Sequence, residues 1–259
     1  MGKLAVVTGA STGIGYQLAH LAAGAGYDLL VAANEESIKA AAADFERHGR
    51  DVVVVEADLA TIEGVDTMLA SIDGRIIDVL CANAGSGTGG AFLDVAVDDW
   101  RHSIDTNVTG TLYLLQRVLG EMTARRDGKV LVTGSIAGYI PGSFNAVYNG
   151  TKAFIDNFTD ALRDELKDHE GVTVTTLMPG ATDTEFFARA DMLDTGVGET
   201  EHKDDPAKVA RDGWDAMMKG EAKIISGWYN KAQVAAAAIA PPAILAKLHR
   251  SLAKPSKSV

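Results

Sequence analysis

The sequence predicts an α/β domain in which a doubly wound parallel sheet carries helices on both of its faces. Short apolar runs rich in β-branched residues alternate with longer amphipathic stretches along most of the 259-residue chain, as expected for buried parallel strands and the helices that cover them. The connections are short, as they are in βαβ units. Glycine, proline or polar residues follow the apolar runs, where sheets of this kind bind ligands.

The same patterns place the elements in chain order. Leu4-Ala-Val-Val-Thr8 is typical of a buried strand, and similar runs predict strands at residues 29–33, 52–56, 77–82, 129–133, 172–177 and 223–226. Helical periodicity predicts helices at residues 14–25, 35–47, 61–72, 98–125, 147–167 and 206–218. The stretch 98–125 is expected to be one long helical region, although Gly110 lies inside it.

We expect residues 1–228 to form a single domain. Residues 182–205 have little periodicity and mix apolar residues with acids and glycines, so they are expected to form a lid loop at the ligand edge, with a disordered acidic loop as the alternative. Residues 229–259 are expected to form a C-terminal helical tail, divided at Pro241-Pro242, that docks on the domain, on a neighbouring subunit or at the substrate cleft.

Composition excludes several classes of protein. Acidic residues outnumber basic ones by 35 to 24, for a formal net charge of −11, which argues against nucleic acid as a partner. Cys81 is the only cysteine, so neither an intramolecular disulfide nor a cysteine-based metal cluster is expected. The six histidines lack metal-ligand spacing, so no metal site is expected.

The protein is expected to be cytoplasmic, because the chain runs into a strand without a charged leader or cleavage site. Neither half of the tail approaches the ~20 apolar residues that a transmembrane helix needs. Basic residues late in the tail (Lys247, Arg250, Lys254 and Lys257) would suit a membrane surface. Contact with such a surface is the less favoured alternative to docking on the protein.

A glycine loop separates the first strand from the first helix. Gly9-Ala-Ser-Thr-Gly13-Ile-Gly15 lets the backbone approach a pyrophosphate at the helix N-terminus, where free N–H groups favour anions. Its Gly-x-x-x-Gly-x-Gly spacing differs from the Gly-x-Gly-x-x-Gly dinucleotide fingerprint, and a plain tight turn is the alternative. The position between strand and helix favours a dinucleotide cofactor.

A serine, a tyrosine and a lysine form the candidate catalytic group. Tyr148 and Lys152 stand four residues apart at the start of a predicted helix, so they share one face. A phenol titrates near ~10, and a fixed ammonium one turn away is expected to lower its pKa, which suits a general acid or base. Ser135 could hydrogen-bond the same substrate oxygen. The alternative is that Tyr148 merely packs and Lys152 is a solvated helix residue.

Five residues from separate loops are expected to meet at one edge of the sheet. Each follows the end of a predicted strand, and the ligand sites of parallel sheets lie at the carboxyl ends of the strands. The five residues are Gly9, Asp58, Asn83, Ser135 and Pro179.

Together these motifs resemble the classical branch of the short-chain dehydrogenase/reductase superfamily, whose members have a Rossmann-type fold. Thr8-Gly-Ala-Ser-Thr-Gly-Ile-Gly15 is similar to the cofactor loop of that family, and Asn83-Ala-Gly85 to the motif after its fourth strand. Pro179-Gly180 and Thr184 are similar to the segment beside the nicotinamide. The resemblance extends to about residue 227.

The resemblance implies a catalytic tetrad and a set of cofactor contacts. In the tetrad, Tyr148 exchanges a proton with the substrate oxygen, Lys152 holds the nicotinamide ribose, Ser135 orients the substrate and the backbone of Asn107 binds a water. Asp58 would contact the adenine. The cofactor positions implied are Gly9, Ser11, Thr12, Gly13, Ile14, Gly15, Asn34, Asp58, Leu59, Asn83, Ala84, Gly85, Tyr148, Lys152, Pro179, Gly180, Thr182 and Thr184.

The resemblance leaves NAD and NADP both open as the cofactor. Ala33 stands where NAD-using relatives carry an acid, while Asn34 and Thr12 stand where NADP-using relatives often carry a basic residue. Glu35 and Glu36 would repel a 2′-phosphate, although they would also suit the first turn of a helix. These residues together favour NAD slightly as the cofactor.

The favoured function is therefore an NAD(P)-dependent oxidoreductase that interconverts a secondary alcohol and a ketone on a moderately hydrophobic small molecule. A catalytically silent dinucleotide sensor is the alternative, and a serine hydrolase using Ser135 is disfavoured because the Gly-x-Ser-x-Gly elbow is missing. The resemblance also implies a homodimer or homotetramer that pairs helices near residues 100–125 and 147–167.

Overall fold

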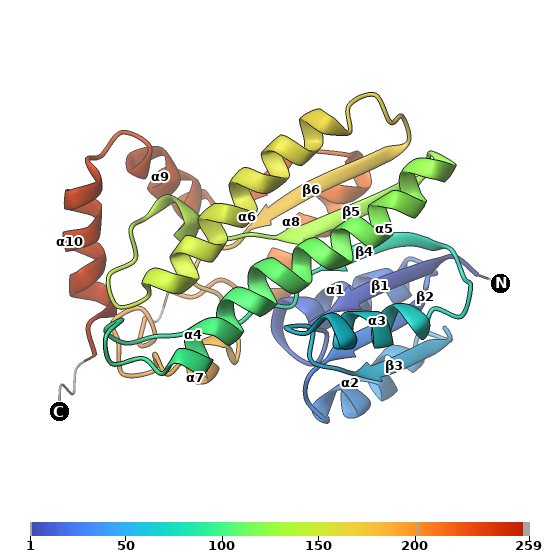
Figure 1. The fold of residues 1–259 in the computed structure, drawn as a ribbon, viewed down its shortest axis with the longest axis horizontal. Helices are drawn as coiled ribbons and strands as arrows, with labels where there is room; N and C mark the ends of the chain where they lie inside the picture. The colour runs from blue at the N-terminus through green and yellow to red at the C-terminus, as the bar shows by residue number, and fades with distance from the viewer. Residues whose placement is uncertain (1, 201, 256–259) are drawn as a thin grey trace.

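The computed structural model describes residues 2–200 and 202–255. Within these residues, seven parallel strands form one central sheet in the order β3-β2-β1-β4-β5-β6-β7 (Figure 1). The strands are β1 (Leu4–Thr8), β2 (Asp28–Ala33), β3 (Val52–Glu56), β4 (Ile77–Ala82), β5 (Gly128–Thr133), β6 (Val172–Met178) and β7 (Lys223–Ile225). The predicted doubly wound, Rossmann-type α/β fold is confirmed, and its strand order reverses between β1 and β4.

Helices cover both faces of the sheet. The longer helices and short turns are α1 (Gly13–Gly24), α2 (Ser37–Glu46), α3 (Ile62–Ala70), α4 (Val97–Ile104), the π-helix η1 (Asp105–Gly110), α5 (Thr111–Arg125), the 3₁₀-helix η2 (Ile136–Tyr139), α6 (Ala146–Glu165), α7 (Phe186–Arg189), α8 (Pro206–Lys219), α9 (Trp228–Ala237) and α10 (Pro242–Ala253). No helix among the described residues is both long and apolar enough to span a bilayer.

Alternating side chains on the strands divide the interior into two cores. On β1, Leu4 and Val6 join a buried cluster with residues of α3, α5 and α6. Ala5 and Val7 join the cluster on the other face, with residues of α1, α2 and α8. Both faces of the strand are therefore apolar, which explains why its sequence reads as a continuous hydrophobic run.

The long helical region expected at residues 98–125 is helical throughout, but it is not a uniform α-helix. This region consists of α4, the π-helix η1 and α5, because the backbone widens by a residue at Asp105–Gly110. Here the chain comes so close to the loop after β3 that a side chain on Gly110 would collide with the carbonyl oxygen of Leu59. Such π segments occur mostly at functional sites, and this one carries Asn107.

The C-terminal helices α9 and α10 lie against the rest of the chain (Figure 1). The first begins at Trp228, whereas the sequence placed the helical tail from residue 229. Ser143 donates a hydrogen bond to the carbonyl of Ala246 in α10 (3.1 Å), and the carbonyl of Leu252 accepts one from the Val197 amide (3.0 Å). Lys257, one of the basic residues of the tail, lies outside the described residues.

Candidate active site

The five residues expected at one edge of the sheet do lie there. Gly9 follows β1, Asn83 follows β4 and Pro179 follows β6 directly, whereas Asp58 and Ser135 come two residues after β3 and β5. Because these strands are parallel neighbours in one sheet, their carboxyl ends share an edge. The edge spans the point where the strand order reverses, which is the usual ligand site in such folds.

The glycine loop makes a tight turn that leaves no room for side chains at its glycines. Gly9 and Gly13 adopt positive φ angles of 64° and 59°, which residues with a Cβ rarely adopt. A side chain on Gly15 would collide with the carbonyl oxygen of Gly9 and would lie 2.5 Å from the Asn83 amide nitrogen. Thr12, the N-cap of α1, makes no capping side-chain hydrogen bond to a described residue, so the first amides of the helix remain available to an anion.

A threonine that the sequence analysis did not single out ties the loops together. The Thr8 hydroxyl accepts hydrogen bonds from the backbone amides of Asn83 and Ala84, both at 2.9 Å. The Asn83 side chain donates to the Thr8 carbonyl at 3.1 Å and accepts a hydrogen bond from the Thr133 hydroxyl at 3.0 Å. These bonds fix the loops after β1, β4 and β5 relative to one another.

Helix α6 presents the tyrosine and the lysine on one face. The helix begins at Ala146, so Tyr148 and Lys152 lie one turn apart in its first two turns. The Lys152 ammonium is buried, donates to the Thr133 carbonyl at 2.8 Å and lies 5.8 Å from the centre of the Tyr148 ring. Ser135 begins η2, and its hydroxyl accepts a hydrogen bond from the Ala137 amide at 3.1 Å.

Asn107 completes this group from the π-helix. Its side-chain oxygen accepts from the Ser86 amide at 2.8 Å, and its nitrogen donates to the Ser86 carbonyl at 2.7 Å and to the Thr151 hydroxyl at 2.9 Å. A side chain on Gly85 would lie 3.3 Å from the Asn107 oxygen and 3.5 Å from the Lys152 ammonium. The structure thus brings the loop after β4, the π-helix and the lysine together.

Burial dominates the pKa values of the tyrosine and the lysine. It raises the pKa of the Tyr148 phenol to about 12, and the Ser135 hydroxyl acts in the opposite direction. It lowers the pKa of the Lys152 ammonium to about 8, against the effect of the Asp156 charge. The net shift in the pKa of Tyr148 is therefore opposite in direction to the expected lowering by Lys152, because desolvation of the phenol is its largest cause.

The other expected cofactor residues lie along the same edge, in different surroundings. Asp58 is exposed and accepts a hydrogen bond from the Ala60 amide at 3.0 Å, while Leu59 beside it is buried. Asn34 is exposed after β2. After β6, the Thr182 hydroxyl donates to the carbonyl of Gly180 at 3.0 Å.

A glutamate from the start of the second helix region faces the glycine loop. The Ser11 hydroxyl donates a hydrogen bond to the Glu35 carboxylate. Arg189 of α7 forms an ion pair with the same carboxylate at 2.9 Å and donates to the Thr12 hydroxyl at 3.3 Å. Glu35 therefore lies in the connection between β2 and α2 and contacts the glycine loop. It is not part of the first turn of α2, which begins at Ser37.

The segment 182–205 covers the site with apolar side chains. The Phe186 ring lies 4.9 Å from the Tyr148 ring, centre to centre, and Phe187 and Met192 are buried beside it. Thr184 comes so close to the glycine loop that a side chain on Gly13 would lie 2.8 Å from its methyl group. In its described residues, 182–200 and 202–205, the segment contains α7, and Thr182 pairs with Asp204 in a parallel bridge.

Comparison with known sequences identifies relatives over most of the chain. The profile of the family described as short chain dehydrogenase matches residues 3–193. An uncharacterized oxidoreductase of Staphylococcus epidermidis is 35% identical over 192 residues, covering 73% of this chain and 82% of that protein. An uncharacterized oxidoreductase of Staphylococcus aureus is 33% identical over 189 residues, covering 72% of this chain and 80% of that protein.

Solved structures share the fold at lower sequence identity. A short-chain dehydrogenase from Sphingobium yanoikuyae in complex with NADPH superposes with a TM-score of 0.82 at 23% identity, over 99% of this chain and 98% of that one. A short chain dehydrogenase/reductase from Burkholderia phymatum in complex with NAD gives 0.81 at 21% identity, over 90% and 92%. The family match and the staphylococcal relatives show that this chain is an oxidoreductase of the short-chain dehydrogenase family.

Proposed function

We propose that the protein is an NAD(P)-dependent oxidoreductase that interconverts a secondary alcohol and a ketone. The observation that carries this proposal is that Ser135 follows β5 at the sheet edge that also holds the glycine loop. Tyr148 and Lys152 come from α6, and Lys152 donates to the Thr133 carbonyl at the end of β5. A proton donor and an ammonium next to a dinucleotide site are what carbonyl reduction requires. The apolar cover formed by Phe186, Phe187 and Met192 supports a moderately hydrophobic substrate.

The family resemblance gives each residue a role that suits its chemistry. Tyr148 exchanges a proton with the substrate oxygen, and Ser135 orients that oxygen and stabilises its developing charge. Lys152 holds the nicotinamide ribose, and the backbone of Asn107 binds a water that connects the lysine to solvent. A bound nicotinamide supplies or accepts the hydride. The glycine loop would hold the pyrophosphate against the first turn of α1.

The test is equilibrium binding of NADH and NADPH, measured separately by nicotinamide fluorescence, followed by turnover of a panel of apolar ketones. Binding of at least one coenzyme and turnover of a ketone are the expected results. If neither coenzyme bound, the interpretation of the glycine loop would be wrong. If one coenzyme bound but the protein turned over no ketone or alcohol, a dinucleotide sensor would be the better interpretation.

We propose NAD rather than NADP as the coenzyme. The Glu35 carboxylate lies against the glycine loop on Ser11 and comes two residues after β2, at whose end the family resemblance puts the adenosine ribose. A 2′-phosphate brings about two negative charges, and a fixed carboxylate beside it would repel them. Arg189, the cation that could attract the phosphate, is already paired with Glu35 at 2.9 Å.

Wild-type protein should therefore bind NADH more tightly than NADPH, and Glu35→Gln should narrow the difference. Removing the like charge should tighten NADPH binding by about tenfold, which corresponds to about 1.4 kcal/mol. Glu36→Gln is the matched control, because the Glu36 side chain is 85% exposed and pairs with Lys39 at 3.8 Å instead. Tighter binding of NADPH than NADH by the wild type would contradict this assignment.

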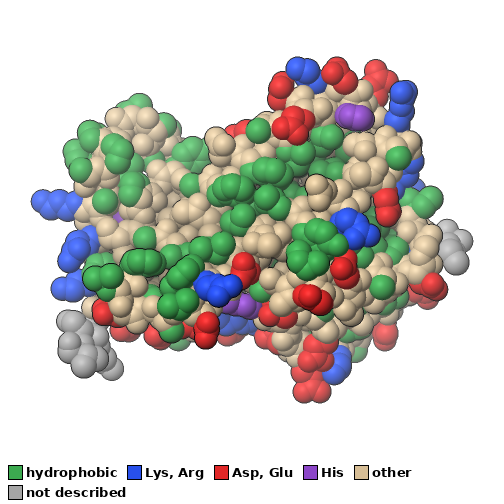
Figure 2. All heavy atoms as spheres, in the orientation of Figure 1, with side chains coloured by type: hydrophobic (Ala, Val, Ile, Leu, Met, Phe, Trp, Pro, Cys, Tyr) green, Lys and Arg blue, Asp and Glu red, His purple; other side chains and the backbone are tan. Residues whose placement is uncertain are grey.

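We propose that the protein forms a homodimer or homotetramer through α5 and α6. Figure 2 shows hydrophobic side chains gathered over α6. On this helix, Phe154 is 45% exposed and stacks on Phe158 with ring planes 7° apart. An exposed apolar patch on a helix is a typical subunit contact.

Phe154→Arg should convert the assembly to monomers at micromolar concentration, because a buried unpaired charge at the centre of an interface is strongly unfavourable. Light scattering after size-exclusion chromatography measures the mass. Ile76→Arg is the control, since Ile76 is also exposed, at 60%, but precedes β4 at the opposite edge of the sheet. A monomeric wild type would refute the proposed assembly.

A further inference from the structure

A buried carboxylate lies next to the candidate catalytic group, and the proposed function gives it no role. Asp156 is on α6, four residues after Lys152 and eight after Tyr148, so the three side chains follow one face of the helix. It is only 7% exposed. An aspartate at a position facing the interior is rare unless a partner or a function keeps it there.

The carboxylate fills the space beneath the turn that presents Ser135. A side chain on Gly134 would collide with one of its oxygens, and a side chain on Gly138 would lie 2.5 Å from the other. Gly134 directly precedes Ser135, and Gly138 lies three residues after it, inside η2. The backbone on both sides of Ser135 therefore packs directly against the Asp156 carboxylate.

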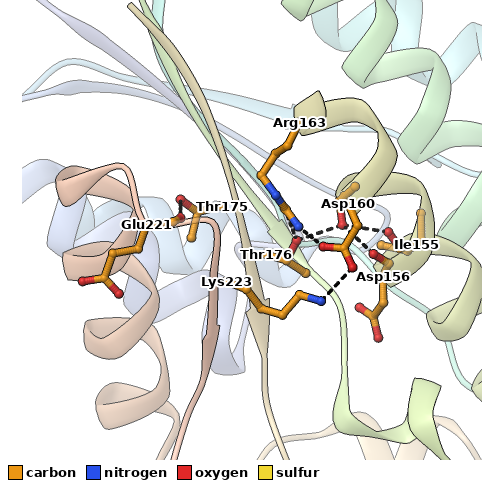
Figure 3. Close-up of polar contacts among 9 residues, drawn as sticks. Ile155, Asp156, Asp160, Arg163, Thr175, Thr176, Glu221 and Lys223 are labelled. Atoms are coloured by element: carbon orange, nitrogen blue, oxygen red, sulfur yellow. Dashed lines mark hydrogen bonds and ion pairs between the residues drawn. The ribbon is translucent and has the colours of Figure 1, made fainter. Parts of the chain in front are cut away.

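Neither carboxylate oxygen makes a hydrogen bond of good geometry with any residue in the described part of the chain. Figure 3 shows the carboxylate pointing away from the network in which Asp160 pairs with Arg163 and Lys223. A buried ionised group without hydrogen bonds is costly. A residue of purely structural purpose would serve better here as an apolar side chain, so the charge itself calls for an explanation.

The charged groups around Asp156 come from three elements. Burial is the largest influence and raises its pKa to about 7, while the charge of Lys152, the charge of Lys223 and the backbone amide of Ser135 favour the carboxylate. Asp160 disfavours it. The titratable groups that face this region lie on three elements. Helix α6 carries Tyr148, Lys152, Asp160 and Arg163, β7 carries Lys223, and η2 carries Tyr139, which raises the pKa of Lys223.

We propose that Asp156 is a positioning residue of the active site: it supports the turn that presents Ser135 and is the counter-charge that keeps the Lys152 side chain an ammonium. It acts through these two residues and touches neither substrate nor coenzyme. The assignment rests on the proposed function, since it gives Lys152 the work of holding the nicotinamide ribose. The effect on Lys152 depends on pH, because Asp156 acts only when it is ionised.

The experiment compares Asp156→Asn with wild type and with Asp164→Asn, a matched change on the exposed side of α6, where the Asp164 carboxylate pairs with Lys167 at 3.2 Å. NADH affinity and kcat for ketone reduction are measured across the pH range. At about pH 6 the variant should match wild type, since a protonated Asp156 is as neutral as the amide. At about pH 8.5 the variant should bind NADH and turn over about tenfold less well, because its lysine loses its proton at lower pH.

The shape of the pH profile separates this role from a purely structural one. A loss that is equal at every pH, or profiles that superimpose throughout, would overturn the proposal. If Asp156→Asn fails to melt cooperatively, Asp156→Ser removes the same charge and leaves room for water, and failure of both to fold would assign Asp156 to stability alone. If wild type binds NADH but reduces no ketone, the proposed function fails, and the pH dependence of NADH binding still decides the role of Asp156.

Discussion

Replacing Tyr148 with phenylalanine is expected to lower kcat for ketone reduction by about 10²–10⁴-fold, the usual contribution of a positioned general acid. The phenylalanine ring keeps the contact with Phe186, whose ring centre is 4.9 Å away, so the fold and the apolar cover of the site should be preserved. NADH affinity should change little, because Lys152 and the glycine loop remain. Steady-state kinetics with a ketone from the panel, together with NADH binding, measure both effects.

Tyr27→Phe is the control for this prediction. Tyr27 precedes β2 at the end of the sheet remote from the site and packs against Trp214, so the variant should retain wild-type kcat. A Tyr148→Phe enzyme with unchanged turnover would remove the tyrosine from the mechanism. If the wild type binds NADH but turns over no ketone, unchanged NADH binding by Tyr148→Phe would favour a sensor, whose response would survive the substitution.

The pKa of Tyr148 sets the direction of its pH dependence. Burial raises this pKa to about 12, so the phenol stays protonated throughout the neutral and mildly alkaline range. The phenol can then donate its proton during ketone reduction. Alcohol oxidation instead needs a base, so it would benefit from a lower pKa of Tyr148. We therefore expect reductive activity to decline at alkaline pH as Lys152, whose pKa is lowered to about 8, loses its proton.

The fold could be predicted because its signals are local and repeated. A strand such as β1 is apolar on both faces, and this pattern alone indicates a covered parallel sheet. The meeting of Gly9, Asn83 and Ser135 follows from the topology, since parallel neighbouring strands end at one edge. Tyr148 and Lys152 share a face because four residues make about one helical turn.

The features that could not be predicted depend on contacts between residues that are far apart in the sequence. Nothing local in residues 98–125 indicates a π-helix, because the collision that requires Gly110 involves Leu59, which lies about fifty positions earlier in the chain. The ion pair between Glu35 and Arg189 joins two segments that are far apart in the sequence. Asp156 did leave a signal, since it continues the spacing of Tyr148 and Lys152 by one more turn, but only the structure shows that it is buried.

Gly15→Ala is expected to abolish detectable coenzyme binding at concentrations that saturate the wild type. The added methyl group would collide with the carbonyl oxygen of Gly9 and lie 2.5 Å from the Asn83 amide nitrogen, and neither can yield without moving the loops after β1 and β4. Overpacking of this kind costs about 1–3 kcal/mol of stability, so the melting temperature should fall by several degrees as well. Nicotinamide fluorescence and thermal unfolding measure the two losses.

Gly120→Ala is the matched control, because Gly120 lies inside α5 and an added methyl group would meet no atom within 4 Å. Alanine stabilises an exposed helix interior by up to about 1 kcal/mol relative to glycine, so this variant should melt at or above the wild-type temperature and bind coenzyme normally. The comparison shows whether the collision is the cause, because both variants replace a helical glycine with alanine. Only at Gly15 does the added methyl group meet the backbone of another segment. A Gly15→Ala protein that binds NADH as wild type does would mean that the glycine loop serves only as a tight turn between β1 and α1.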